Sequence, residues 1–436
     1  MDRVLKLTLL ILLTCIILMF YDLYMLGTFY FYILLGFLLY DIITQKKIKL
    51  IHVWCFAFIF VILSEVFISI GESEDAGLLA ALKFLIIANN IILIGYLSNN
   101  ISRQTHFTNK RTIYSSRGVG DVLLFAITIG YVAMTWSSAV TSFALGREVA
   151  AEGENFVLSS IISAMGFLLP SVCLYYFYHV KKTSIIVPVL LSLPVFIILF
   201  MGGSRFPLLF SFLGFFITYQ NLSQQQISVK RIILMAAAGI VLLSASMAMK
   251  TFRVGGETTA IYTEESPLYK DIPTYFAQYL SNEGVIDMTA LMIQHFAVHN
   301  HLYGASSSFI TYFWIPREFW AEKPTMSGHW FIRLYRGGFG GGHSASFGFT
   351  GDLYADFGYF SLFFVFLIGR LIKTAENFQR KSLASNNYSV ILGAMFYPYI
   401  FFFVRSPITA TMMFLGIVFF FFLFKKILFR ELSIKV

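Results

Sequence analysis

Charged residues are scarce in this chain: Asp, Glu, Lys and Arg together make up 13% of its 436 residues. Since about a quarter of the residues in a soluble protein are charged, the composition excludes an ordinary soluble domain. Hydrophobic residues reach 58%, and the 49 Phe are spread along the whole length. We therefore expect an all-α, polytopic membrane protein.

Cysteine is equally rare, and its three copies, Cys15, Cys55 and Cys173, all fall inside apolar runs. No CxxC pair or Cys/His spacing accompanies them, which argues against a disulfide framework and a zinc centre. His295 and His299 have the i, i+4 spacing of a helix face, but no HExxH glutamate follows His295. The sequence thus predicts no metal site.

Apolar runs close to the bilayer-crossing length of about 20 residues recur along the chain and suggest about twelve spans. They cover residues 5–24, 26–43, 51–71, 77–97, 121–145, 156–178, 184–201, 205–219, 232–249, 352–371, 387–404 and 407–424. With a cytoplasmic N-terminus, most of the 32 Lys and Arg face inward, as the positive-inside rule requires. The net charge of +9 therefore reflects membrane topology, and we expect no nucleic-acid partner.

One polar block, Lys250 to Gly351, interrupts the apolar pattern and divides the chain into three parts. We expect spans one to nine in residues 1–249 and a large periplasmic loop with surface helices in 250–351. Spans ten to twelve and a basic cytoplasmic tail would follow in 352–436. Both termini would then be cytoplasmic.

Two arginines stand at the outer membrane edge in similar contexts: Arg205 in Gly-Gly-Ser-Arg-Phe-Pro and Arg405 in Val-Arg-Ser-Pro. Ser is a good helix N-cap and Pro is tolerated in a first turn, so each arginine lies beside the start of a helix. Helix N-termini and guanidinium groups both bind anions. Arg253, after span nine, is expected at the same edge. The alternative is that these side chains only anchor to lipid headgroups.

Aromatic and acidic residues supply further candidates. Trp314, Trp320 and Tyr354 have ring faces suited to sugars, although interfacial anchoring explains tryptophan at a membrane surface equally well. Asp352 and Asp356 share one helix face at i, i+4, either as a structural pair or as acid/base groups. His343 is a further candidate base.

Glu65 and Lys83 lie inside spans three and four, at similar distances from the acidic turn that joins them. We expect them to meet at one depth and to fix that hairpin by charge compensation.

Several short motifs, taken in order, point to a family. They are Gly-Gly-Ser-Arg at 202–205, the segment from Ile315-Pro316-Arg317 through Trp320 to Lys323-Pro324, and Phe-Gly-Phe-Thr-Gly-Asp-Leu-Tyr-Ala-Asp-Phe-Gly at 347–358, with Arg405 before the last span. In order, spacing and topology the chain resembles Wzy-type polymerases of O-antigen and related polysaccharides.

The resemblance implies a glycosyltransferase of the bacterial inner membrane, with a periplasmic active site and a possible relation to GT-C type enzymes. Its donor and acceptor would be oligosaccharide repeat units linked to undecaprenyl pyrophosphate, with no cofactor and no metal. A chain-length regulator of the Wzz type and membrane lipids are the expected partners.

The resemblance also ranks the site residues. Arg205, Arg253 and Arg405 would hold the pyrophosphate, with Arg317 and Lys323 in support. The base stays open among His343, Glu318, Asp352 and Asp356. Two other functions remain: an O-antigen ligase, which shares donor and topology, and a lipid-linked oligosaccharide flippase or transporter.

Overall fold

The computed structural model describes most of the helical framework. The described residues are 3–45, 48–67, 75–99, 110–116, 118–145, 156–202, 205–223, 284–315, 319–320, 322–323, 328, 330–331, 334, 347–385 and 387–435. They form two compact units, and three helices contribute residues to both: α16 (Ser361–Ser385), α17 (Ser389–Arg405) and α18 (Pro407–Leu428).

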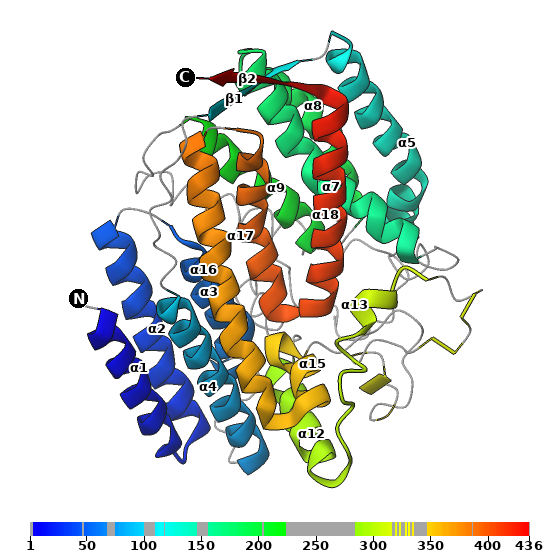
Figure 1. The fold of residues 1–436 in the computed structure, drawn as a ribbon. Helices are drawn as coiled ribbons and strands as arrows, with labels where there is room; N and C mark the ends of the chain where they lie inside the picture. The colour runs from blue at the N-terminus through cyan, green and yellow to red at the C-terminus, as the bar shows by residue number, and fades with distance from the viewer. Residues whose placement is uncertain are drawn as a thin grey trace, which may run out of the picture. The chain divides into compact units, whose positions relative to one another are not determined.

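The first unit comprises Met1–Arg103, Leu268–Glu376 and Ile400–Thr411. Its elements before the polar block are α1 (Arg3–Leu18), α2 (Leu23–Gln45), α3 (Leu50–Phe58), the π-helical turn η1 (Ile59–Leu63) and α4 (Ala76–Ser98). Within and after the block come α12 (Val285–Val298), α13 (Phe309–Tyr312), α15 (Gly348–Phe357) and the 3-10 turn η5 (Gly358–Phe360). Helix α4 is central, since it contacts α1, α2, α3 and α12 (Figure 1).

Buried hydrogen bonds join the first four helices. Trp54 Nε1 donates to Asn89 Oδ1 at 2.7 Å, and Asn89 Nδ2 donates to the hydroxyl of Tyr30 at 2.7 Å. The same hydroxyl donates to Asn90 Oδ1 at 2.6 Å, and Asn90 Nδ2 reaches Thr14 Oγ1 at 3.2 Å. Because polar side chains within a membrane bundle need partners inside the protein, this chain of bonds fixes how α1 to α4 align.

Helices α4 and α16 approach closely where each carries a glycine. A Cβ at Gly95 would lie 2.2 Å from the carbonyl oxygen of Phe366, and a Cβ at Gly369 would lie 2.1 Å from that of Ile92. Small residues at a helix contact allow two backbones to meet in this way. The contact fixes the start of α16 against α4.

The second unit comprises Gln104–Pro267, Asn377–Tyr399 and Met412–Val436. Its helices are α5 (Gly120–Leu145), α7 (Phe156–Leu174), η3 (Tyr175–Val180), α8 (Ile186–Met201) and α9 (Arg205–Ser223). Its two strands, β1 (Lys110–Ser116) and β2 (Phe429–Lys435), pair antiparallel from Lys110 opposite Lys435 to Ser116 opposite Phe429. The all-α expectation missed this ribbon, whose strands lie outside the apolar runs.

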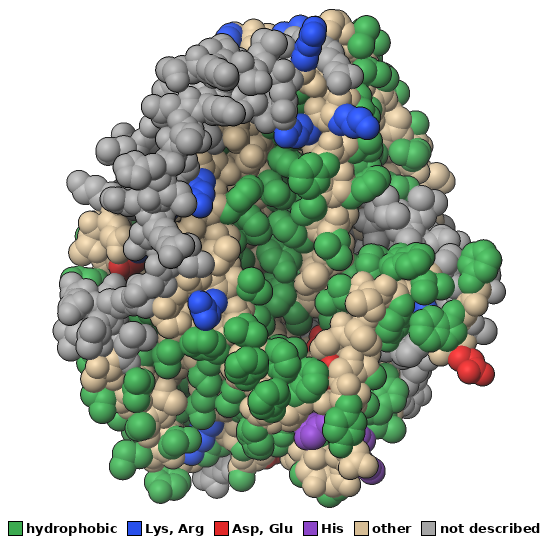
Figure 2. All heavy atoms as spheres, viewed as in Figure 1, with side chains coloured by type: hydrophobic (Ala, Val, Ile, Leu, Met, Phe, Trp, Pro, Cys, Tyr) green, Lys and Arg blue, Asp and Glu red, His purple; other side chains and the backbone are tan. Residues whose placement is uncertain are grey.

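The apolar surface agrees with a membrane environment. Five helical segments among the described residues are long and apolar enough to cross a bilayer: Leu23–Gln45, Ala76–Ser98, Gly120–Phe143, Gly348–Ala384, which takes in α15, η5 and most of α16, and Pro407–Leu428. Large apolar side chains such as Phe125, Ile129 and Trp136 are exposed, and hydrophobic groups predominate on the face in Figure 2. A soluble monomer does not expose such extensive apolar surface. The expected span over 232–249 lies outside the described residues.

The helix predicted over 352–371 is divided. Helix α15 ends at Phe357, Gly358 follows with φ of +57°, and α16 begins at Ser361 (Figure 1). This left-handed backbone suits glycine, and a Cβ at Gly358 would lie 2.6 Å from His301 Nε2. The break makes α15 a separate short helix, which packs on α12.

Candidate functional site

The two acids predicted on one helix face do lie together on α15, where they hold the segment after α12. Asp356 is fully buried, and its two carboxylate oxygens accept the backbone N–H of Ser306 at 2.9 Å and that of Ser307 at 2.7 Å. Asp352 accepts the hydroxyl of Ser306 at 2.9 Å. The backbone adds a further bond, from Tyr303 N–H to Asp356 O at 3.0 Å.

The hydrogen bonds of Asp352 and Asp356 bear on which of the two acids is the better candidate for acid/base catalysis. A carboxylate whose two oxygens each accept a backbone N–H fixes the loop that carries those N–H groups. Asp356 therefore has a clear structural task, and an acid/base role for it stays a prediction. Asp352 lies one turn nearer the start of α15 and accepts a side-chain hydroxyl, so neither of these two backbone N–H bonds ties it to the loop, and it is the acid that we favour for proton transfer.

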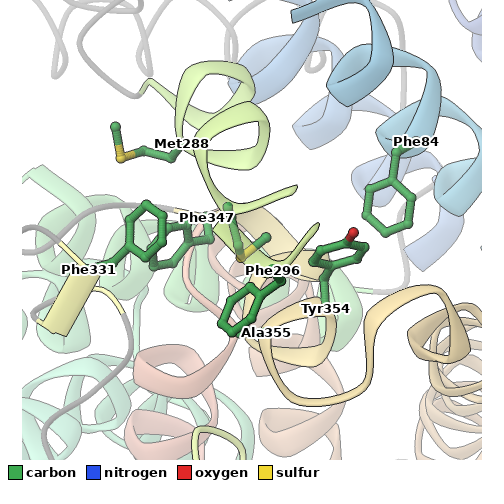
Figure 3. Packing of buried hydrophobic residues seen from close by; sticks show 8 residues of the cluster. Phe84, Met288, Phe296, Phe331, Phe347, Tyr354 and Ala355 are labelled. Carbon is green, nitrogen blue, oxygen red and sulfur yellow. The ribbon is translucent and has the colours of Figure 1, made fainter. Parts of the chain in front are cut away.

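Tyr354 lies in the core beneath these acids. Its side chain is 4% exposed, with ring centroids 5.1 Å from Phe84 and 5.5 Å from Tyr359, in edge-on contacts. Figure 3 shows it facing Phe84 inside a cluster that also contains Phe296, Phe331 and Phe347. Sugar stacking needs an open ring face, so in this structure Tyr354 supports the site from below and offers no platform.

The two predicted tryptophans are at the surface. Trp314 is 59% exposed and its Nε1 donates to Thr311 O at 2.7 Å. Trp320 is 38% exposed and its ring lies 5.2 Å from that of Tyr312. Both rings are accessible, as a sugar platform or a membrane anchor requires, and each has one contact within the segment, a hydrogen bond for Trp314 and a tilted ring contact for Trp320.

Lys323 is buried under this aromatic segment. Its ammonium donates to the carbonyl oxygens of Phe313 and Ile315, both at 2.8 Å, and lies 5.5 Å from the ring centroid of Phe309. Because carbonyl oxygens occupy two of its donor directions, Lys323 fixes the loop. Its predicted contact with a pyrophosphate remains untested.

The arginine motifs begin helices as the sequence predicted. Helix α18 starts at Pro407, and Ser406 O accepts the N–H of Ala410 at 2.9 Å. Arg405, at the end of α17, is half-buried beside that start. Helix α9 starts at Arg205. The side chain of Arg205, and the whole of Arg253, Arg317, Glu318 and His343, lie outside the described residues, so their roles stay predictions.

The expected pairing of Glu65 with Lys83 is wrong. The Glu65 carboxylate accepts the backbone N–H of Ile286 at 3.1 Å and 3.2 Å, and that of Asp287 at 3.5 Å. The Lys83 ammonium instead donates to Leu18 O at 3.2 Å and lies 5.8 Å from the ring centroid of Tyr21. Free N–H groups at the start of α12 outcompete the lysine, and no local pattern near residue 65 signals this distant partner.

Two histidines at the end of α12 form a second feature that sequence reasoning did not resolve. The rings of His295 and His299 stack at 4.3 Å, and His295 meets Trp330 edge-on at 5.6 Å. Partial desolvation, and then the neighbouring His299, lower the pKa of His295 below its ordinary value. His295 is therefore neutral at pH 7.

Together the helices, the exposed apolar faces and the acid-bearing helix α15 define a multi-pass membrane protein. The family model for the O-antigen polysaccharide polymerase Wzy matches residues 3–431, so the chain belongs to this family. The resemblance drawn from the short motifs is thereby confirmed, and the chain is a polymerising glycosyltransferase of polysaccharide biosynthesis. The searches of curated proteins and of solved structures gave no match.

Proposed function

We propose that the protein joins oligosaccharide repeat units carried on undecaprenyl pyrophosphate, at the periplasmic face of the bacterial inner membrane. The growing glycan is transferred to the non-reducing end of the next lipid-linked unit. The observation that carries this proposal is the family match over residues 3–431. Arg405 beside the start of α18 supports the assignment of the donor.

The proposed reaction breaks the bond between the anomeric carbon of the growing chain and its pyrophosphate. A hydroxyl of the acceptor sugar forms the new bond to that carbon and gives up its proton, and undecaprenyl pyrophosphate leaves. Negative charge on the leaving group grows as the bond breaks, and bidentate guanidinium groups stabilise it. We assign this task to Arg405, Arg205 and Arg253, with Arg317 in support.

Lys323 is proposed as a secondary ligand of the pyrophosphate, because its ammonium is already bonded to two loop carbonyls. Trp314 and Trp320 are proposed to stack on the sugars. The proton acceptor is one of Asp352, Glu318, His343 and Asp356, with Asp352 favoured over Asp356 because Asp356 holds two backbone N–H groups. In this scheme arginine supplies the positive charge, so no metal takes part.

Replacement of Arg405 tests the proposal. Arg405→Ala removes charge-assisted hydrogen bonds, each worth about 1.5–3 kcal/mol, so we expect polymerisation to slow by about tenfold to a hundredfold. In cells, the long surface glycan should collapse to a single repeat unit on gels. Arg405→Lys keeps the charge but loses the bidentate geometry, and its chains should be intermediate in length.

Lys426→Ala is the matched control, since Lys426 lies in the last turn of α18, far along the same helix from its start. Long chains in Arg405→Ala at normal protein levels would refute the assignment. A deletion strain separates the competing functions: a polymerase leaves single-unit glycan, whereas a ligase leaves none on the surface and accumulates long lipid-linked polymer. Purified protein that moves lipid-linked units across liposomes without joining them would indicate a flippase.

A further inference from the structure

Helix α12 begins without a cap of its own. Its N-cap residue is Gly284, which has φ of +57° and no side chain to accept a hydrogen bond. The first turn of every helix leaves backbone N–H groups without partners inside the helix. In α12 the N–H groups of Ile286 and Asp287 point instead to the carboxylate of Glu65, which is 221 positions away from Ile286 in sequence.

The contact is buried. Glu65, Val285 and Ile286 are all 0% exposed. A buried carboxylate costs free energy unless hydrogen bonds and positive charge compensate it, and the N-terminal end of a helix supplies both. Glu65 follows the turn η1, which contacts α12. The acid therefore connects the α3–η1 helix to a helix of the polar block.

The capped end of α12 adjoins the candidate site. A Cβ at Gly348, the first residue of α15, would lie 2.9 Å from Val285 Cγ1 and 3.5 Å from Val404 O. Arg405 is the next residue after Val404. The start of α12, the start of α15 and the end of α17 therefore lie close together in space.

The same region packs against α3. Phe349, the second residue of α15, has its ring centroid 5.0 Å from that of Trp54 and 6.2 Å from that of Phe58. Phe403, two residues before Arg405, lies 6.3 Å from Trp54. Helix α3, which leads to Glu65, is therefore the surface on which both site elements rest.

We propose that Glu65 is a positioning residue, which docks α12 on the membrane helices and thereby holds α15 and the Arg405 end of α17 in the arrangement that binds the lipid-linked donor. This inference rests on the proposed function of Arg405. If only the docked form binds donor, the apparent KM rises as the inverse of the docked fraction that remains, and kcat changes less.

The docking itself is measured by thiol protection in the full-length purified protein. Thr289→Cys, at a fully buried position of α12, is introduced after the three native cysteines are replaced by alanine. Glu65→Gln keeps the side-chain size but exchanges one acceptor oxygen for an amide donor, which opposes the helix N–H groups. We expect a hydrophilic maleimide to label Thr289→Cys about tenfold faster in Glu65→Gln, as loss of a buried hydrogen bond predicts.

The matched control is Lys83→Gln, which changes the residue expected from sequence to pair with Glu65. It should leave both labelling and polymerisation kinetics unchanged. With a lipid-linked repeat unit as substrate, Glu65→Gln should raise the apparent KM more than it lowers kcat. Glu65→Asp, which keeps the charge but is one methylene shorter, replaces Glu65→Gln if the latter does not elute as a folded protein.

Unchanged labelling in the Glu65 variants would overturn the docking. Labelling fast enough to show that most molecules are undocked, with unaltered kinetics, or a fall in kcat at constant KM, would overturn the positioning role. Arg405→Ala separates this inference from the proposed function, since it should slow polymerisation strongly without exposing Thr289→Cys. If Arg405→Ala still polymerises normally, the phosphate assignment fails while the labelling result for Glu65 stands on its own.

Discussion

Among single residues, the two acids of α15 carry different tasks although the sequence treats them alike. Both lie on one helix face, as the i, i+4 spacing predicts. Asp356 accepts two backbone N–H groups and Asp352 accepts one hydroxyl. Which acid holds the backbone of the loop depends on Ser306 and Ser307, which are distant in sequence.

Replacement by asparagine should separate the two acids. Asp356→Asn places an amide donor against a backbone N–H, so we expect a loss of roughly 1–3 kcal/mol of unfolding free energy and a lower melting temperature in detergent. Asp352→Asn keeps an acceptor for the Ser306 hydroxyl and should melt close to the native protein. If Asp352 is the base, this variant should fold but not polymerise.

Equal melting temperatures for the two variants would contradict the structural role of Asp356. Activity in a well-folded Asp352→Asn protein would remove Asp352 from the candidates and leave Glu318, His343 and Asp356. Purified protein, thermal melting and glycan gels are sufficient for both comparisons.

At the scale of elements, the break at Gly358 determines where the site lies. Without it, residues 352–371 would form one continuous apolar helix, as the hydropathy pattern alone predicts. The left-handed residue and the close approach of His301 make α15 a separate helix, packed on α12.

Gly358→Ala should therefore destabilise the protein, by roughly 1–3 kcal/mol for the positive-φ backbone alone and more for the contact with His301. Gly36→Ala in α2 is the matched control, because a Cβ there meets nothing within 4 Å. In a helix interior that change is expected to stabilise by about 0.5–1 kcal/mol. Thermal melting of both variants measures the difference, and a neutral Gly358→Ala would show that the break does not depend on glycine.

At the scale of the whole molecule, the proposed orientation has a direct consequence. Glu322 is exposed beside the aromatic segment, and Arg430 lies in the C-terminal strand β2. If the polar block is periplasmic and the tail cytoplasmic, Glu322→Cys should react with a membrane-impermeant maleimide in cells whose outer membrane is opened. Arg430→Cys should react only after the inner membrane is permeabilised.

Both single-cysteine proteins need a background without Cys15, Cys55 and Cys173. Labelling of Arg430→Cys in intact inner membranes, or protection of Glu322→Cys there, would require the opposite orientation. It would also place Arg405 at the cytoplasmic edge, away from the proposed donor.

The sequence by itself determined the class of protein. Exposing polar groups to lipid costs free energy, so each membrane helix is rich in apolar residues and poor in charged ones. Scarce charge and repeated apolar runs predict a membrane bundle, the short motifs predict the family, and Ser-Pro and Gly-Gly-Ser-Arg predict the starts of α18 and α9. These signals are local, so they can be read without the fold.

Only the tertiary structure decided which residues meet. Glu65 bonds to α12 instead of Lys83, Tyr354 packs against Phe84 in the core, and Lys323 bonds to loop carbonyls. Each outcome depends on a partner from another part of the chain, selected by packing and by the need to satisfy buried polar groups. Residue type and spacing show that a group can act, whereas its partners in the fold determine what it does.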